Sequence, residues 1–197
     1  SWDRLNPGTA VLLEAAMLDE ADRVLDLGCG TGVVGAAAAL EVREAVLVDC
    51  NVAAVECARA TLAANGIANA EVRLSDGCSG LEMGSFDAVL SHLPRERAVQ
   101  EELLRGAAAV LRPGGSLYFV AHRDAGFRGA LRIAREVFGR CGVIRRKKGY
   151  HVAMAARPPD WEGCSAPHPY AARTVVVDGM ETVVVGKPGV FAWDRLD

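Results

Sequence analysis

Short apolar runs alternate with longer amphipathic stretches from residue 23 to residue 138. The short runs, such as 24–27 and 45–49, are rich in Val, Leu and Ala and have the length of buried strands. The longer stretches are alanine-rich or repeat apolar residues three and four positions apart, which is typical of helices. Strands that alternate with helices predict a parallel, doubly wound sheet. The predicted strands are 24–27, 45–49, 70–74, 86–90 and 116–120, and the predicted helices are 33–40, 52–64, 97–111 and 127–138.

The end of this region departs from the alternation. Residues 143–146 and 150–154 are two strand-like runs, and only Lys147, Lys148 and Gly149 separate them. A connection this short joins neighbouring antiparallel strands. The predicted fold class is therefore α/β, with a doubly wound, seven-stranded, mostly parallel sheet of Rossmann-like architecture that ends in an antiparallel strand pair.

The segment after residue 157 has a different composition. Residues 158–173 contain several Pro, Gly and Ser residues and are predicted to be a linker. Two Val-rich runs then flank Asp178 and Gly179, which predicts a β-hairpin with a two-residue turn. The unpaired apolar character of this hairpin indicates packing on a neighbouring domain or subunit. The predicted units are a main domain at 1–157, the linker at 158–173, and a C-terminal unit at 174–197 that begins with the hairpin.

One short sequence occurs near both ends of the chain. Trp-Asp-Arg-Leu stands at residues 2–5 and again at residues 193–196. The simplest interpretation is a tandem duplication, in which 174–197 contains the start of a second repeat and the chain is a piece of a longer protein. Two unrelated surface tails are the alternative.

The formal net charge of -3 excludes a global positive field that would attract nucleic acid. Basic residues are instead concentrated at 145–148, the tip of the predicted antiparallel pair. This cluster is interpreted either as a contact for RNA phosphates or as a solvated tip beside acidic neighbours. Earlier arginines that could extend it are Arg123, Arg128, Arg132 and Arg135.

The six cysteines form no C-x-x-C pair, and no histidines with zinc-finger spacing accompany them. Reduced thiols and no metal site are therefore expected. The sequence contains no apolar run of membrane-spanning length, and its first residues do not have the pattern of a signal peptide. The prediction is a cytoplasmic protein without membrane contact.

A glycine-rich turn follows the first predicted strand, with Gly28, Cys29, Gly30 and Gly32. Glycines at such a turn let the backbone approach a ligand closely, and the helix that follows aims N–H groups at it. Both S-adenosylmethionine and a nicotinamide dinucleotide use such a turn, and residues 30–35 fit G-x-G-x-x-G. Asp26, just before the glycines, favours S-adenosylmethionine, because a carboxylate attracts the methionine ammonium and repels a pyrophosphate.

Two further acids follow the next two predicted strands. Asp49 stands about 20 residues beyond the glycine turn, where a carboxylate accepts hydrogen bonds from ribose hydroxyls of either cofactor. Asp76 follows the third strand and is a candidate partner for the adenine amino group. The alternative for each acid is a structural role in a turn.

Residues 24–32 resemble motif I of class I S-adenosylmethionine-dependent methyltransferases. Residues 5–9, 148–152 and 189–192 narrow the resemblance to ribosomal RNA guanine-N2 methyltransferases, the small-subunit methyltransferase C type and its large-subunit relatives. The resemblance implies S-adenosyl-L-methionine as cofactor, ribosomal RNA as substrate and a protein built from two methyltransferase-fold halves. The expected partner is thus a second methyltransferase-like domain, or another subunit in a homodimer formed through the C-terminal hairpin. With Thr9 beside the cofactor, the candidate cofactor-binding residues are Thr9, Asp26, Gly28, Cys29, Gly30, Gly32, Asp49, Cys50, Asn51, Asp76, Gly77 and Ser91.

The family it resembles binds the base amine with an Asn-Pro-Pro-aromatic turn after the fourth strand, and this sequence departs from that turn. His92 stands at the Asn position, Leu93 at the first Pro and Arg95 at the aromatic, while Pro94 matches. A histidine near its pKa accepts a proton or a hydrogen bond. An arginine stacks on a base or holds a phosphate. The candidate catalytic residues are Ser91, His92, Pro94 and Arg95.

These observations leave four functions open. The first is a methyltransferase that modifies guanine N2 in ribosomal RNA. The second is a half-protein that keeps the cofactor fold but has lost its substrate site and serves in structure or RNA docking. The third is a small-molecule methyltransferase, although no long insertion is present to form a lid over the pocket. The fourth is a nicotinamide-dependent oxidoreductase that would use the G-x-G-x-x-G match at residues 30–35.

Overall fold

The computed structural model describes residues 5–163 and 170–190. The two copies of Trp-Asp-Arg-Leu therefore lie outside the described residues, apart from Leu5. Cys164, one of the six cysteines, and His168 also lie outside the described residues.

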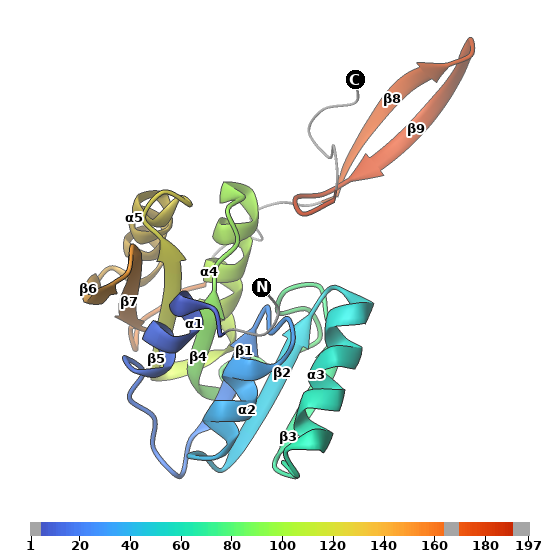
Figure 1. The fold of residues 1–197 in the computed structure, drawn as a ribbon. Coiled ribbons are helices and arrows are strands. Elements are labelled where there is room, and N and C mark those ends of the chain that lie inside the picture. The colour runs from blue at the N-terminus through green and yellow to red at the C-terminus, as the bar shows by residue number, and fades with distance from the viewer. Residues whose placement is uncertain (1–4, 164–169, 191–197) are drawn as a thin grey trace.

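Seven strands form one sheet in the order β3-β2-β1-β4-β5-β7-β6, as Figure 1 shows. The first five strands are parallel, and β7 lies between β5 and β6 and runs antiparallel to both. This confirms the predicted seven-stranded, mostly parallel sheet with its antiparallel pair. The strand order reverses between β1 and β4, and in open α/β sheets ligands bind at this point, outside the carboxyl ends of the strands. The strands are β1 (Arg23–Leu27), β2 (Glu44–Asp49), β3 (Ala70–Leu74), β4 (Phe86–His92), β5 (Leu111–His122), β6 (Cys141–Lys147) and β7 (Tyr150–Ala156).

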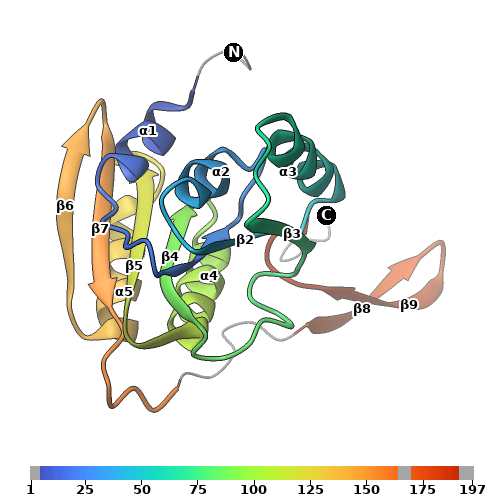
Figure 2. The same cartoon turned by 90° about the horizontal axis from the view of Figure 1, so that it is seen from below.

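Helices cover both faces of the sheet, which explains why its central strands read as continuous apolar runs (Figure 2). On one face lie α1 (Pro7–Leu13), α2 (Val33–Ala39) and α3 (Val52–Ala64), and on the other lie α4 (Arg97–Val110) and α5 (Phe127–Phe138). Within the described residues, no helix is long and apolar enough to span a membrane.

The first helix, α1, was not among the predicted elements. It has only seven residues, with Pro7 at its first position and the Asn6 side chain accepting a hydrogen bond of 2.8 Å from the Gly8 N–H. Val11 and Leu12 are fully buried in the core that also contains Tyr118. Tertiary packing therefore stabilises a helix too short to be recognised by periodicity.

The boundary between α4 and β5 also differs from the prediction. The helix ends at Val110, and β5 begins at Leu111 instead of residue 116. Leu111 pairs with Phe86, and the register then shifts before Ser116 pairs with Ala88. An irregularity of this kind accommodates a Pro-Gly-Gly sequence within a strand, because the proline has no N–H to donate.

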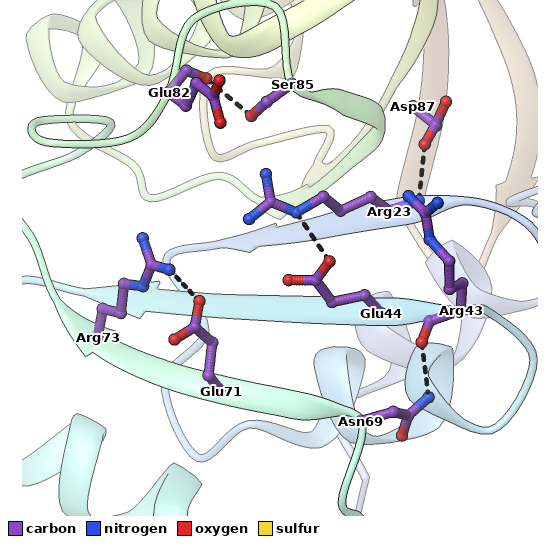
Figure 3. A network of polar contacts seen from close by, with 9 residues as sticks. All are labelled: Arg23, Arg43, Glu44, Asn69, Glu71, Arg73, Glu82, Ser85 and Asp87. Atoms are coloured by element: carbon purple, nitrogen blue, oxygen red, sulfur yellow. Dashed lines mark hydrogen bonds and ion pairs between the residues drawn. The ribbon is translucent and has the colours of Figure 1, made fainter.

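Polar side chains join the strands where the parallel strands begin, at the edge opposite the glycine turn (Figure 3). The Arg23 backbone N–H donates to Asp87 at 2.7 Å, and the Arg23 side chain forms an ion pair of 3.0 Å with Glu44. The Asn69 amide donates to the backbone carbonyls of Ala39 at the end of α2 and of Val42 and Arg43 in the loop before β2. These contacts hold the amino ends of neighbouring strands together. The candidate site residues lie at the opposite edge, where the parallel strands end.

A separate two-stranded sheet extends away from the main sheet (Figure 1). It consists of β8 (Ala171–Val177) and β9 (Met180–Gly186), so β8 begins within the segment expected to be a linker. Asp178 and Gly179 both have positive φ, as a type I′ turn requires. Most of its valines are exposed.

Candidate active site

The glycine turn between β1 and α2 contains backbone with positive φ, a conformation that glycine adopts most readily. Gly28, Gly30 and Gly32 have φ of 79°, 54° and 79°. A Cβ at Gly28 or Gly30 would meet no atom within 4 Å, so both positions border open space. A Cβ at Gly32 would lie 2.9 Å from the Cβ of Ala58 in α3. Gly28 and Gly30 therefore face a ligand space, whereas Gly32 permits two helices to pack closely.

Asp26 lies at the end of β1 and is 2% exposed. Its Oδ2 accepts a hydrogen bond of 2.7 Å from the Gly35 N–H in the first turn of α2. Burial raises the pKa of Asp26 to about 7, against the opposing effect of this hydrogen bond and with a further contribution from Asp49. No cation forms an ion pair with Asp26 among residues 5–163 and 170–190. A buried carboxylate without a cation is suited to a positively charged ligand.

Asp49 links the glycine turn to α3. One of its carboxylate oxygens accepts from the Gly30 N–H and the other from the Asn51 N–H, each at 2.9 Å. Asn51 caps α3 by accepting a hydrogen bond of 2.9 Å from the Ala53 N–H, while Cys50 is exposed. Each carboxylate oxygen keeps a second lone pair, so Asp49 remains able to accept from a ligand hydroxyl.

A cavity of about 630 Å³ lies between the glycine turn, α1 and the end of β4. It brings together five of the predicted cofactor-binding residues and His92 of the predicted substrate turn. Asn6, Leu5, Thr31, Val33 and Val34 also line it and were not among the candidate site residues. The candidate residues that line it are Thr9, Asp26, Gly28, Cys29, Gly30 and His92. Burial raises the pKa of the Cys29 thiol to about 12, so the thiol stays neutral at physiological pH.

The residues of the predicted substrate turn point in different directions. His92 borders the cavity, but Ser91 is 1% exposed and its hydroxyl donates to the Leu27 carbonyl at 2.8 Å. Ser91 thereby joins the carboxyl ends of β4 and β1. Pro94 and Arg95 are exposed beyond the end of β4. The Pro94 carbonyl accepts a hydrogen bond of 2.6 Å from the Gln100 amide.

Tyr150 connects His92 to a second histidine, His122. Tyr150 lies edge-on to His92, with ring centroids 5.8 Å apart, and edge-on to His122 at 5.1 Å. A Cβ at Gly8 would lie 2.6 Å from the Tyr150 ring, so α1 packs directly against this ring. Burial lowers the pKa of His92, which keeps its imidazole neutral near pH 7. Tyr150 was not among the candidate site residues, although it lies in one of the segments that carried the family resemblance.

Asp76 lies apart from the cavity residues. Its carboxylate forms an ion pair of 2.5 Å with Lys187, the residue that follows β9, and lies 3.5 Å from the Tyr170 hydroxyl. Lys187 also forms an ion pair of 2.8 Å with Glu102 of α4. Gly77 follows with φ of 59°. Nothing in the local sequence around Asp76 indicated a lysine more than 100 positions away, and only the three-dimensional structure reveals this contact.

The chain is similar in sequence and in fold to known proteins. The chain matches the family model of the methyltransferase small domain over residues 1–154. It is 37% identical over 164 residues to ribosomal RNA large subunit methyltransferase G of Streptomyces avermitilis, covering 79% of this chain and 42% of that protein. It is 34% identical to ribosomal RNA small subunit methyltransferase C of Pseudomonas syringae, covering 80% of this chain and 48% of that protein.

A solved structure with a similar fold is the T. thermophilus 16S rRNA N2 methyltransferase RsmC in complex with AdoMet and guanosine. It superposes with a TM-score of 0.82 at 27% identity, covering 98% of this chain and 49% of that one. The chain thus spans less than half the length of each of these three relatives.

Proposed function

The chain belongs to the methyltransferase small domain family, and from this membership we propose that it binds S-adenosyl-L-methionine at the β1–α2 turn and methylates guanine N2 in ribosomal RNA. The names of its relatives support a ribosomal RNA substrate. The methyltransferase unit is assigned to residues 1–157, with 158–173 as linker and 174–197 as hairpin and following segment. We propose that it acts in the cytoplasm, because its named relatives are ribosomal RNA methyltransferases of bacteria.

The residues at the turn fit this cofactor. Asp26 is buried, borders the cavity and has no cationic partner among the described residues, and the open space beside Gly28 and Gly30 leaves room for a ligand close to the backbone. Asp26 would hold the ammonium of the methionine moiety, and Asp49 would accept hydrogen bonds from the ribose hydroxyls. When bound, the cofactor supplies an electrophilic methyl group on its sulfonium.

The adenine end is assigned to the loop after β3. Asp76 would accept a hydrogen bond from the adenine amino group, with Gly77 and Cys50 beside it. The ion pair with Lys187 fixes the position of Asp76 Oδ1. Asn51 contributes indirectly, because it caps α3 and so orients the backbone next to Asp49.

The acceptor end is assigned to His92. A guanine amine is a weak nucleophile because its lone pair is delocalised into the ring, so its N–H groups need a well-placed hydrogen-bond acceptor. The neutral imidazole of His92 provides that acceptor and can receive the proton that the amine loses. The base would enter over exposed Pro94, with Arg95 placed to stack on it or to hold a phosphate. Ser91 is a positioning residue, since its hydroxyl fixes the end of β4 to β1.

One observation carries the proposal: Asp26 and His92 line the same cavity. A cofactor group and an acceptor group that share one cavity can be brought into contact, and methyl transfer depends mainly on such positioning.

The proposal is tested by two measurements on the same preparation. Calorimetric titration with S-adenosylhomocysteine measures cofactor binding, and transfer of a labelled methyl group to ribosomal RNA from cells lacking this protein measures turnover. We expect the chain to bind S-adenosylhomocysteine and to transfer the labelled methyl group to a guanine N2. Mapping of the modified base identifies that guanine. Binding of NAD without binding of S-adenosylhomocysteine would contradict the proposal.

A second function, RNA docking without methyl transfer, is favoured by one feature of the substrate turn. Leu93 is buried in the core, 4% exposed, at the position where the family it resembles has the first proline of its base-binding turn. A half that docks RNA without catalysing transfer would leave ribosomal RNA unlabelled. If it also lacked affinity for S-adenosylhomocysteine, it would be a structural half of a longer protein.

A further inference from the structure

The basic cluster at 145–148 is divided between the two faces of the sheet. A β-bulge lies in β6 between Val143 and Arg145, where Val143 pairs with Ala153 but Arg145 pairs with Val152. The extra residue reverses the alternation, because successive side chains of a strand point to opposite faces. Arg146 therefore lies opposite His151 and shares the α5 face with Val143.

The two neighbours of Arg146 lie on the α1 face and share one carboxylate there. Arg145 and Lys147 form ion pairs of 3.0 Å and 2.8 Å with Glu14 at the end of α1. These contacts lower the pKa of the Glu14 carboxyl, with the Lys147 hydrogen bond as the largest cause. This part of the cluster is thus structural, as the solvated-tip interpretation expected, whereas Arg146 is not.

Arg146 borders a cavity of about 510 Å³ on the α5 face. Arg123, Arg128 and His151 converge on the same space, and Asp124 is the only acidic residue among those that line it. Its apolar walls are Phe127, Leu131 and Val143, and His151 lies edge-on to Phe127 with centroids 4.9 Å apart.

Two of these cations have no anionic partner in the described part of the chain. Arg123 is 3.4 Å from Asp124, but no hydrogen bond or ion pair of the Arg128 or Arg146 side chain is found within residues 5–163 and 170–190. Their charges act on His151, whose pKa is lowered by burial and then by Arg146, Arg123, His122 and Arg128. The start of α5 adds to this field, because its N-cap Gly126 offers no side chain to its first N–H groups.

The cavity lies next to the proposed acceptor site, on the other face of the same sheet edge. Arg123 follows His122, and His151 follows Tyr150, while the His122 and Tyr150 rings are in edge contact and Tyr150 contacts His92. A strand of nucleic acid that places a base at His92 can therefore cross this edge with its backbone passing the cavity.

We propose that the cavity formed by Arg123, Arg128, Arg146 and His151 binds a phosphodiester of the RNA strand next to the nucleotide that is methylated. The proposal rests on the proposed function in taking RNA as the substrate. Arginine suits this role because its planar guanidinium donates two parallel hydrogen bonds to a phosphate. Because the arginines converge on one cavity of about 510 Å³, they suit a single phosphate group.

The test compares two double variants that remove the same charge. Arg128→Ala with Arg146→Ala removes the two cavity arginines that have no anionic partner among the described residues. Arg132→Ala with Arg145→Ala is the control, because those arginines are paired with Glu136 and Glu14 outside the cavity. Binding of a short, fluorescein-labelled single-stranded RNA is measured by anisotropy between roughly 50 and 200 mM salt.

We expect the cavity variant to lose about tenfold in affinity at the low-salt end and to reduce the slope of log affinity against log salt by about 0.7, the value for one phosphate of a single strand. The control variant should lose less than about twofold, with its slope nearly unchanged. Equal losses in both variants would overturn the proposal, because they would indicate a diffuse charge effect.

Titration with S-adenosylhomocysteine distinguishes this inference from the proposed function. The cavity variant should bind S-adenosylhomocysteine as the unaltered chain does, since none of its residues lines the cofactor cavity. If the unaltered chain binds no S-adenosylhomocysteine but the variants still differ in RNA affinity, the proposed function fails and the phosphate site stands. If methyl transfer occurs and the KM for RNA is the same in both variants, the phosphate site fails alone.

Discussion

The Gly35 N–H donates a hydrogen bond of 2.7 Å to Oδ2 of Asp26, and the same glycine lies against Leu47 of β2. The helix α2 can approach the sheet this closely only because position 35 has no side chain. The close approach aims the Gly35 N–H at the carboxylate and leaves the opposite side of Asp26 open to the cavity. The glycines of this segment thus serve helix packing at positions 32 and 35 and ligand access at positions 28 and 30.

Substitution Gly35→Ala should destabilise the fold. A Cβ at this position would lie 2.3 Å from Cγ of the buried Leu47, so α2 must shift or Leu47 must leave its rotamer. Overpacking of this kind costs about 1–3 kcal/mol. Gly129→Ala in α5 is the matched control, because no atom lies within 4 Å of the added Cβ, and it should be neutral or stabilise by up to about 1 kcal/mol. Urea denaturation measures both, and equal stabilities of the two variants would contradict this account of α2 packing.

Cofactor affinity should depend on pH through Asp26. Its pKa of about 7 lies above the ordinary value of 3.8, so the carboxylate that attracts an ammonium group forms only as the pH rises through 7. We expect S-adenosylhomocysteine to bind about tenfold more tightly at pH 8 than at pH 6. Asp26→Asn should bind it weakly and without this dependence, as calorimetry would show. An unaltered chain whose affinity is flat over this interval would remove Asp26 from the ammonium site.

The same group should affect stability in the opposite direction. Because the folded-state pKa of Asp26 is raised, the folded protein binds its proton more tightly than the unfolded chain does. The stabilising contribution is fully present below about pH 4 and is lost as the pH rises to about 7. The stability of Asp26→Asn relative to the unaltered chain should therefore increase between pH 4 and pH 7, as measured by urea denaturation without cofactor. A difference that stays constant over this interval would show that Asp26 titrates normally.

Substitutions at His92 should separate chemistry from cofactor binding. His92→Ala removes the acceptor and should lower kcat by about 100-fold or more, while the affinity for S-adenosylhomocysteine changes little. His92→Asn retains an acceptor and should keep much of the activity. In the unaltered chain, kcat should fall at acidic pH, because protonation of His92 removes its lone pair; burial places this loss below the ordinary pKa of 6.5. Unchanged turnover in His92→Ala would exclude His92 from the reaction.

Substitution Lys187→Met should loosen the C-terminal hairpin. It leaves the carboxylates of Asp76 and Glu102 next to each other without a shared cation. Since Asp76 is substantially exposed, the expected loss is about 1 kcal/mol. Limited proteolysis should cleave residues 170–190 faster than in the unaltered chain, and Lys187→Arg should restore protection. Equal cleavage rates in all three proteins would show that this ion pair does not hold the hairpin.

The sheet was predictable because helices cover both of its faces. Burial on both sides gives β1, β2 and β4 continuous apolar runs, and the short connection around Lys148 indicated an antiparallel pair. The helix α1 was not predicted, because it has only seven residues and depends on burial of Val11 and Leu12. Local sequence does not contain that information.

The candidate site was predictable where its residues lie at the end of a strand or directly follow one. Asp26, Gly28 and Gly30 lie together because the turn after β1 is a single local structure. Two other relationships required the three-dimensional structure. The contact of Tyr150 with His92 joins two strands separated by β5. The position of Arg146 on the same face as Val143 depends on a β-bulge that no residue type in the sequence indicates.

The contact between Lys187 and Asp76 connects the hairpin to the loop assigned to the adenine end. Two sites connected through one shared group are thermodynamically linked, and the linkage is reciprocal. A macromolecule that binds the exposed valines of β8 and β9 and displaces Lys187 would change the affinity of Asp76 for adenine by some factor. The cofactor must then change the affinity of the hairpin for that macromolecule by the same factor.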